Sequence, residues 1–230
     1  MPEISETLQG LLLIDKPAGL TSFAVAHKIK NILNVKKTGH CGTLDPAATG
    51  LLLILVGRAV KMQETFMKKD KVYTSSFLLG TVTDTGDLDG NIVSKKDFSD
   101  ITQDMIEKEL NRFKGEILQT PPMYSAINHN GQKLYKLARK GITVERKPRK
   151  VFIKEAKLLS YNNGTIDVRI ECSSGTYIRS IAADLGEVLG CGASVSALRR
   201  EKIDIYDVKD AVTQKDFGDK EKIIANIKSV

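Results

Sequence analysis

A turn-rich segment directly before a strongly apolar run is the feature that most constrains this chain. Residues 37–50 read KTGHCGTLDPAATG, and the run LLLILV follows at residues 51–56. Such a run is typical of a buried strand, so the core should hold the segment at its C-terminal side. Pro46 biases Asp45 toward extended geometry, and the Asp45 carboxylate is therefore predicted to be oriented in advance. On the residues alone, a simple turn without a function stays an equal alternative.

Further segments carry recognisable patterns in a fixed order along the chain. They are LLIDKPAG at residues 12–19, DKVY at 70–73, LGTVTDTGD at 79–87, PMYSA at 122–126 and CSSGTYIR at 172–179. Together with GHCGTLDPAATG at residues 39–50, they resemble the motifs of the tRNA pseudouridine synthase B (TruB) family. The resemblance extends over most of residues 10–200 and implies the pseudouridine synthase fold.

Composition indicates one soluble globular domain over residues 1–230. Hydrophobic residues make up 41% and charged residues 27% of the chain, which is typical of folded rather than disordered proteins. The longest apolar run is far shorter than the ~20 residues that span a bilayer, and the N-terminus lacks the pattern of a signal peptide. We therefore expect no membrane association and a cytoplasmic location.

The cysteines give no sign of a metal site or a disulfide framework. Cys41, Cys172 and Cys191 are odd in number and lack C-x-x-C spacing, so we expect reduced thiols and no bound metal. Cys41 lies in the turn-rich segment, but no His and Asn or Asp set supports a nucleophile there. It is interpreted as a small space-filling residue.

Strand patterns dominate the chain, with helices between them. Strands are predicted near residues 11–14, 51–56, 72–79, 92–94, 151–160, 165–172 and 194–199. Helices are predicted near residues 22–33, 59–67, 102–113, 132–140, 177–189 and 220–227. No β-α-β repeat or glycine-rich nucleotide loop is present. The predicted class is α/β of the α+β type, with a mixed, largely antiparallel sheet flanked by helices.

Two helices have predicted inward faces. In the helix at residues 22–33, capped by Thr21 or Ser22, the inward residues are expected to be Phe23, Ala26, Ile29 and Leu33. In the helix at residues 102–113 they are expected to be Met105, Ile106, Leu110 and Phe113.

Basic residues are concentrated in one segment. Lys136 to Lys150 contains seven basic residues and one acid, Glu145, in a chain of net charge +7. A charge run often marks only a solvated face, but a basic surface is also what a phosphate backbone requires. The resemblance implies that residues 116–150 form an insertion that folds over RNA. The expected RNA backbone contacts are Lys136, Arg139, Lys140 and Arg149.

The resemblance also implies an active site. Asp45 would be the nucleophile, Arg179 its ion-pair partner, and Tyr73 a ring against the target base that helps to move a proton. Tyr177 and Leu198 would line the uracil pocket. His40, as a positively polarised imidazole, would occupy the stack vacated by the flipped base. Ordinary core or surface roles are the alternatives for these residues, most of all for Leu198.

The reaction that the resemblance implies is isomerisation of uridine-55 in the tRNA T loop, which needs no cofactor. The expected partner is the T stem-loop of tRNA, and the expected oligomeric state is a monomer. A short helical tail near residues 210–230 ends the chain, without a separate C-terminal RNA-binding domain. The alternatives are an RNA-guided pseudouridine synthase and an RNA-binding or RNA-folding factor with vestigial catalysis.

Overall fold

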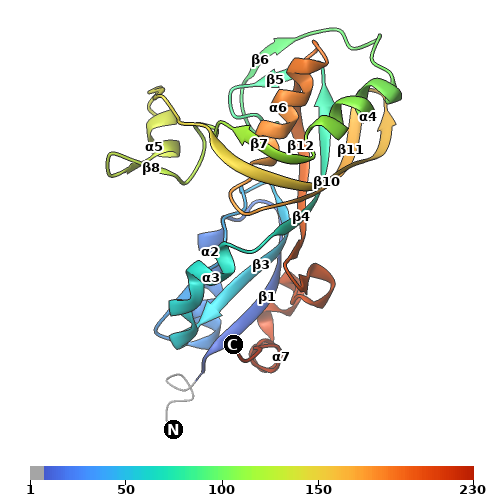
Figure 1. The fold of residues 1–230 in the computed structure, drawn as a ribbon. Coiled ribbons are helices and arrows are strands. Elements are labelled where there is room, and N and C mark those ends of the chain that lie inside the picture. The colour runs from blue at the N-terminus through green and yellow to red at the C-terminus, as the bar shows by residue number, and fades with distance from the viewer. Residues whose placement is uncertain (1–7) are drawn as a thin grey trace. The chain divides into compact units, whose positions relative to one another are not determined.

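The computed structural model describes residues 8–230. The chain forms two compact units, one of Met1–Tyr73 with Arg199–Val230 and one of Thr74–Leu198; they are called unit 1 and unit 2 below. Two long strands, β4 (Lys71–Leu79) and β12 (Ala193–Ile203), contribute residues to both units. Figure 1 gives the course of the chain.

Unit 1 is built around the apolar strand that follows the turn-rich segment. This strand, β3 (Thr49–Val56), pairs antiparallel with β1 (Gly10–Lys16) and with β2 (Thr38–His40), and parallel with β12 through Arg199 and Arg200. From Gly50 to Val56 every residue of β3 is buried. Its two faces enter two separate core clusters, which is why the run has no polar alternation.

Helices cover both faces of β1 and β3. The first core cluster joins β1 and β3 to α2 (Ser22–Leu33), the 3₁₀ segment η3 (Gln214–Gly218) and α7 (Lys220–Ala225). The second joins them to η1 (Gly57–Met62), α3 (Gln63–Met67), β13 (Tyr206–Asp207) and η2 (Val208–Asp210). The predicted strand at residues 51–56 is therefore confirmed.

Unit 2 contains the other long strands of the sheet. The strand order is β1-β3-β12-β4-β11-β10-β7, and the sheet has nine strands in all. β10 (Arg149–Asn162) pairs antiparallel with β11 (Thr165–Cys172) and with β7 (Gly115–Gln119). α4 (Gln103–Arg112) packs on β10 and on α6 (Ile178–Val188), as Figure 1 shows. The predicted mixed, largely antiparallel sheet with flanking helices is confirmed.

Two small hairpins complete unit 2. β5 (Thr81–Thr83) pairs with β6 (Ile92–Lys95), and β8 (Asn128–His129) pairs with β9 (Gln132–Lys133) ahead of α5 (Leu134–Ala138). The helix predicted at residues 132–140 is thus shorter, because Gln132 and Lys133 are used in the hairpin. No helix among residues 8–230 has the length and apolar character needed to cross a membrane.

The predicted inward faces of two helices need correction. Phe23 is 72% exposed, and the buried stripe of α2 instead runs through Ser22, Val25, Ala26, Ile29 and Leu33. Ser22, one position earlier, faces inward because its hydroxyl is hydrogen-bonded to the backbone of the buried Leu44. Phe23, the next residue of the helix, therefore points to a different side and is left in solvent. Met105 in α4 is 41% exposed, whereas Ile106 and Leu110 are buried.

Candidate active site

The segment that carries Asp45 is a loop between β2 and β3 in unit 1. One backbone hydrogen bond lies within the loop, from Ala48 N to Asp45 O at 3.1 Å. Two others tie the loop to its surroundings: Cys41 N donates to Leu53 O and Gly19 N donates to Pro46 O, both at 2.9 Å. The last bond joins the loop to the Lys-Pro-Ala-Gly turn after β1. The strand pairing of β1 and β3 therefore brings two of the sequence motifs together.

Three buried side chains hold the backbone of this loop, and we call them the loop clamp: Lys16, Ser22 and Arg200. The Arg200 guanidinium donates to Gly42 O at 3.1 Å and to Leu51 O at 2.7 Å. The Ser22 hydroxyl accepts from Leu44 N at 2.8 Å and donates to Leu44 O at 3.2 Å. The Lys16 ammonium donates to Pro46 O at 3.1 Å, and also to the carbonyls of Leu20 and Pro17. Each of the three side chains is at most 1% exposed.

The clamp places two buried cations close to the Asp45 loop. Burial lowers the pKa of Lys16 to about 8; the negative charge of Asp45 acts in the opposite direction, and Arg200 lowers the pKa further. Lys16 is therefore near enough to the Asp45 carboxylate to be stabilised by it.

Cys41 is a buried residue of the same loop. Its thiol is fully shielded from solvent, and burial raises its pKa to about 12 against the opposing effects of Arg200 and Lys71. A thiol with such a pKa stays protonated at neutral pH and is a poor nucleophile. This agrees with the interpretation of Cys41 as a space-filling residue.

His40 ends β2, a short way after the basic pair Lys36 and Lys37. Its backbone carbonyl accepts from Gln63 Nε2 at 2.8 Å, and its Nδ1 is buried with no hydrogen-bond partner among residues 8–230. Burial, followed by the charge of Arg200, lowers the pKa of His40 below its usual value. A lowered pKa favours the neutral imidazole in the free protein, and the positively polarised ring that is expected beside RNA phosphates stays a prediction.

Tyr73 lies on β4 in a buried part of the strand. Its side chain is 8% exposed, and Lys71 two positions earlier is also buried, donating through Nζ to the carbonyls of Met67 and Lys69. Asp204 N donates to Asp70 O at 2.9 Å, which joins the start of β4 to the end of β12. Asp45, His40 and Tyr73 accordingly all belong to unit 1.

Arg179 lies near the start of α6 in unit 2. Its Nη1 donates to Thr85 O and its Nη2 to Tyr124 O, both at 2.8 Å, and its Nε lies 3.6 Å from Asp87 Oδ2. The guanidinium therefore joins two of the motif segments, LGTVTDTGD and PMYSA. The predicted ion pair of Arg179 with Asp45 stays a prediction.

Tyr177 precedes α6 and is fixed by Gln119, a residue that no sequence motif includes. The buried Gln119 side chain accepts from Tyr177 N at 2.7 Å and donates to Tyr177 O at 3.1 Å. Gln119 is the last residue of β7, so these two hydrogen bonds attach the backbone of Tyr177 to the end of that strand. Leu198 also belongs to unit 2, on β12, where it is half-buried.

The chain is similar to known proteins over nearly its whole length. Residues 30–178 match the N-terminal domain of TruB family pseudouridylate synthases, and residues 179–227 match the C-terminal domain of tRNA pseudouridylate synthase B. The chain belongs to the TruB family. It is 60% identical to tRNA pseudouridine synthase B of Endomicrobium trichonymphae, covering 99% of each chain. It is 44% identical to the protein of that name from Francisella philomiragia, covering 97% of this chain and 76% of the other. Pseudouridine synthases are isomerases, and this chain is an enzyme of that class.

Solved structures of longer chains show the same fold. The structure of a Cbf5-Nop10-Gar1 complex matches with a TM-score of 0.73 at 28% identity, and the archaeal box H/ACA sRNP Nop10-Cbf5 complex with 0.72 at 26%. The chain covers 55% and 62% of the length of those chains.

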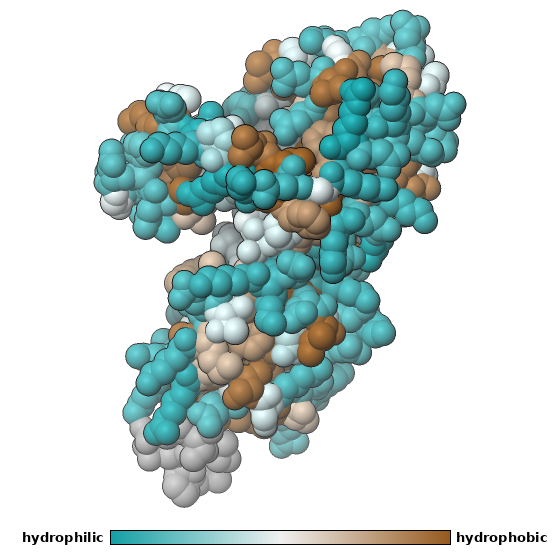
Figure 2. All heavy atoms as spheres, in the orientation of Figure 1, coloured by the Kyte–Doolittle hydropathy of each residue, from teal (hydrophilic) through white to brown (hydrophobic). Residues whose placement is uncertain are grey.

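Residues 116–150, predicted to form an insertion and called the insertion below, expose their cations. Lys136, Arg139, Lys140 and Arg149 are all accessible to solvent to some degree, and the Arg139 guanidinium lies 5.6 Å from the centre of the Tyr135 ring. A cavity of about 240 Å³ in the same part of the chain is lined by Pro121, Ile127, Asn128, His129, Leu134, Glu145, Arg146, Lys147 and Arg149. Figure 2 shows a mostly hydrophilic surface around α5. The insertion therefore offers cations to solvent rather than an apolar contact face.

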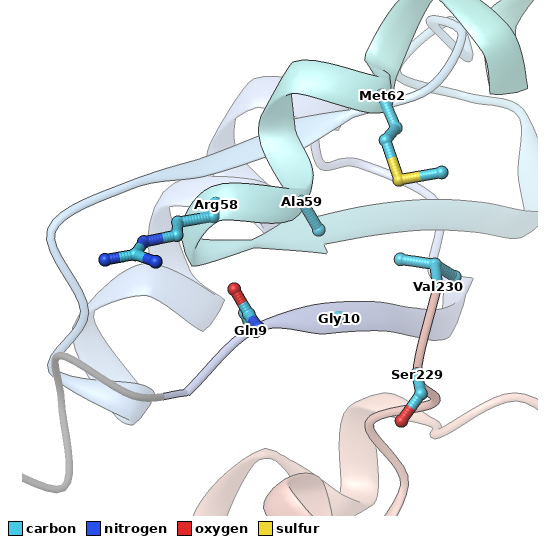
Figure 3. Close-up of a pocket in the computed structure, with 7 residues that line it drawn as sticks. All are labelled: Gln9, Gly10, Arg58, Ala59, Met62, Ser229 and Val230. Carbon is cyan, nitrogen blue, oxygen red and sulfur yellow. The ribbon is translucent and has the colours of Figure 1, made fainter.

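A second cavity, of about 210 Å³, lies in unit 1 away from the predicted TruB site residues. Gln9, Gly10, Arg58, Ala59, Met62, Ser229 and Val230 line it, with Met62 and Val230 facing each other in Figure 3. No group of three or more His, Cys, Asp or Glu side chains that could hold a metal occurs within residues 8–230.

Proposed function

We propose that this protein isomerises uridine-55 in the T loop of tRNA to pseudouridine, with Asp45 as the nucleophile. The observation that carries the proposal is the Asp45 loop itself, held at Gly42, Leu44 and Pro46 by buried side chains and flanked by two buried cations. Relatives at 60% and 44% identity are tRNA pseudouridine synthases B, which supports tRNA as the substrate.

The reaction breaks the bond from ribose C1′ to uracil N1 and forms a bond from C1′ to C5. Asp45 attacks either the base ring or C1′, and the detached uracil turns within the site. The proton on C5 then leaves to solvent, while N1 takes up a proton, so no redox change occurs. The steps require a fixed carboxylate, a proton acceptor and walls that hold the free base.

The remaining site residues receive roles that match their chemistry. Arg179 would pair with the Asp45 carboxylate and keep it ionised. Tyr73 would pack its ring on the base and take part in the proton transfer. Tyr177 would contact the uracil edge, and Leu198 would pack against the base.

His40 would fill the stack that the flipped uridine leaves, which offsets part of the unstacking cost. Its lowered pKa, caused by burial, makes a neutral ring available for that contact in the free protein. The cations Lys136, Arg139, Lys140 and Arg149 of the insertion would contact RNA phosphates.

Tritium release from an unmodified tRNA transcript carrying 5-tritiated uridine tests the proposal. The wild type is expected to release tritium, and Asp45→Asn is expected to release none while binding the transcript with nearly unchanged affinity. Asp210→Asn removes an exposed carboxylate in the same unit and should keep full activity. A transcript with cytidine at position 55 should release no tritium from the wild type.

Two other outcomes would point to the alternatives. Tight tRNA binding without any tritium release would favour an RNA-binding or RNA-folding factor. Release only after addition of a guide RNA and partner proteins would favour an RNA-guided enzyme, an alternative suggested by the similarity to the Cbf5 complexes. The monomeric state and the cytoplasmic location stay predictions.

A further inference from the structure

Two aromatic side chains on α2 are left on the surface of unit 1. Phe23 is 72% exposed and His27 is exposed as well. Their ring centroids are 6.1 Å apart and their planes are 18° from parallel, which is an offset-stacked arrangement. We call these two residues the aromatic pair. A single exposed apolar side chain is common on a protein surface, whereas two rings stacked on each other in solvent are a more specific feature.

Hydrogen bonds at two points join the helix that carries the aromatic pair to residues 38–44. Ser22, just before Phe23, is bonded to Leu44, the residue just before Asp45, at 2.8 Å. Ala26, just before His27, accepts from Thr38 Oγ1 at 3.0 Å, and Thr38 begins the strand that ends at His40. Each member of the pair is therefore one residue from a bond to the segment that carries His40 and Asp45.

The charge around the aromatic pair suits RNA. α2 reads SFAVAHKIKNIL and has no acidic residue; Lys28, which also lies 5.3 Å from the centre of the Phe217 ring, is exposed, as are Lys36 and Lys37 just after the helix. Exposed cations beside an exposed aromatic ring form the combination on which proteins bind single-stranded RNA: the cations attract phosphates and the ring stacks on a base.

We propose that Phe23 and His27 form a stacking surface for an unpaired nucleobase of the RNA substrate, next to the uridine bound at the Asp45 loop. The proposal rests on the proposed function, because it takes the substrate to be a folded RNA loop with extruded bases. Stacking on aromatic and imidazole rings is the usual way in which proteins hold such bases. The ligand is one base of the same RNA whose uridine reacts.

Equilibrium binding of the tRNA transcript to Phe23→Ala and Phe23→Trp tests the stacking surface. Removal of one base–aromatic stack is expected to weaken binding about 5- to 150-fold for Phe23→Ala, whereas Phe23→Trp retains the wild-type affinity. The dependence of affinity on salt should be the same in all variants, because no phosphate contact is removed. His27→Ala should show a smaller effect of the same kind.

Transcripts with a single abasic site at each T-loop position identify the stacked base. One of them should bind the wild type and Phe23→Ala equally, because its stacking partner is already missing. Ile205→Ala is the matched control: it removes an apolar side chain of the same unit that is 81% exposed, and it should leave binding unchanged.

The outcomes separate this inference from the proposed function. If the wild type binds and isomerises tRNA while Phe23→Ala binds within about twofold of it, the stacking surface is wrong and the proposed function stands. If the wild type neither binds nor isomerises tRNA, the proposed function is wrong, and the stacking surface, which depends on it, is wrong as well. A concentration-dependent dimer that Phe23→Ala abolishes, with RNA binding intact, would overturn the stacking surface and show that the pair contacts a second copy of the chain.

Discussion

Lys16 has a buried ammonium group, which its place in the sequence does not predict. Lysines are rarely buried unless paired, yet its ammonium is shielded from solvent and satisfied by three backbone carbonyls, one of them Pro46 O in the Asp45 loop. In the sequence, Lys16 stands out only as part of a motif. Nothing in the spacing of LLIDKPAG shows that its side chain folds inward onto a loop thirty residues away.

The depressed pKa of Lys16 is open to direct measurement. In an NMR titration, the Lys16 side-chain resonance should move with a midpoint near pH 8, whereas exposed lysines titrate above about pH 10. Lys16→Met identifies the resonance by its absence. In Asp45→Asn the midpoint should fall below that of the wild type, because the charge of Asp45 raises the pKa.

The same shift has a consequence for stability with a definite sign. From about pH 8 to 10.5 the unfolded chain still holds the Lys16 proton that the folded protein has released. The unfolded state then binds more protons, so the free energy of unfolding contributed by this group rises with pH in that window. A Lys16 midpoint above about pH 10 would contradict both the burial of the ammonium and its effect on stability.

At the scale of elements, α2 is joined to the Asp45 loop through the Ser22 hydroxyl. Ser22→Ala leaves Leu44 N without this partner in a buried place, which costs about 1–3 kcal/mol. The loop geometry should suffer more than the fold, so kcat is expected to fall about 10- to 100-fold with KM nearly unchanged. Tritium release under saturating and limiting tRNA separates the two constants.

Ser194→Ala is the matched control for Ser22→Ala. Ser194 is fully buried, and its hydroxyl accepts from Thr83 N at 3.1 Å, in unit 2. This variant should be destabilised to a similar degree without the same fall in kcat. An equal fall in kcat in the two variants would mean that Ser22 acts only on stability.

The sequence predicted a strand or a helix face well where the hydrophobic pattern allowed one interpretation. It did so less well where two adjacent residues both fitted the buried face of a helix. The run at residues 51–56 is buried on both faces, as expected, because it has no polar position. Phe23 was placed inward by its spacing from Ala26, but Ser22 and Val25 also fit that stripe and are buried instead. Spacing alone could not show that a bond to Leu44 would decide between them.

The side chains that support the site could not be predicted from the sequence either, because their hydrogen-bond partners lie far away along the chain. Arg200 stands in the sequence as one of several cations, yet its guanidinium bonds Gly42 O and Leu51 O. Gln119 belongs to no motif, yet its amide fixes the backbone of Tyr177. Both are long-range contacts from side chains to backbone, which local patterns do not encode. The family resemblance supplied the residues of the candidate site but not the side chains that support them.

At the scale of the whole molecule, the net charge of +7 is unevenly distributed, and seven of the basic residues lie within Lys136 to Lys150. A general positive charge attracts RNA from a distance, but only cations that contact phosphates release counterions on binding. The two effects separate when affinity is measured against salt. The slope of log K against log[salt] reports the number of phosphate contacts, whatever the total charge of the protein.

Two variants, each with four substitutions and the same change in charge, make this test. The first replaces Lys136, Arg139, Lys140 and Arg149 with alanine, and the second replaces Lys95, Lys108, Lys215 and Lys220, which are exposed cations outside the insertion. In the first, the slope should fall by about 0.7–0.9 for each phosphate that the protein no longer neutralises, and tRNA affinity should drop steeply. The second should keep the wild-type slope and bind only slightly more weakly, because its general field is weaker. Equal slopes in the two variants would mean that the insertion does not contact the RNA backbone, and its cations would then serve only to attract the substrate.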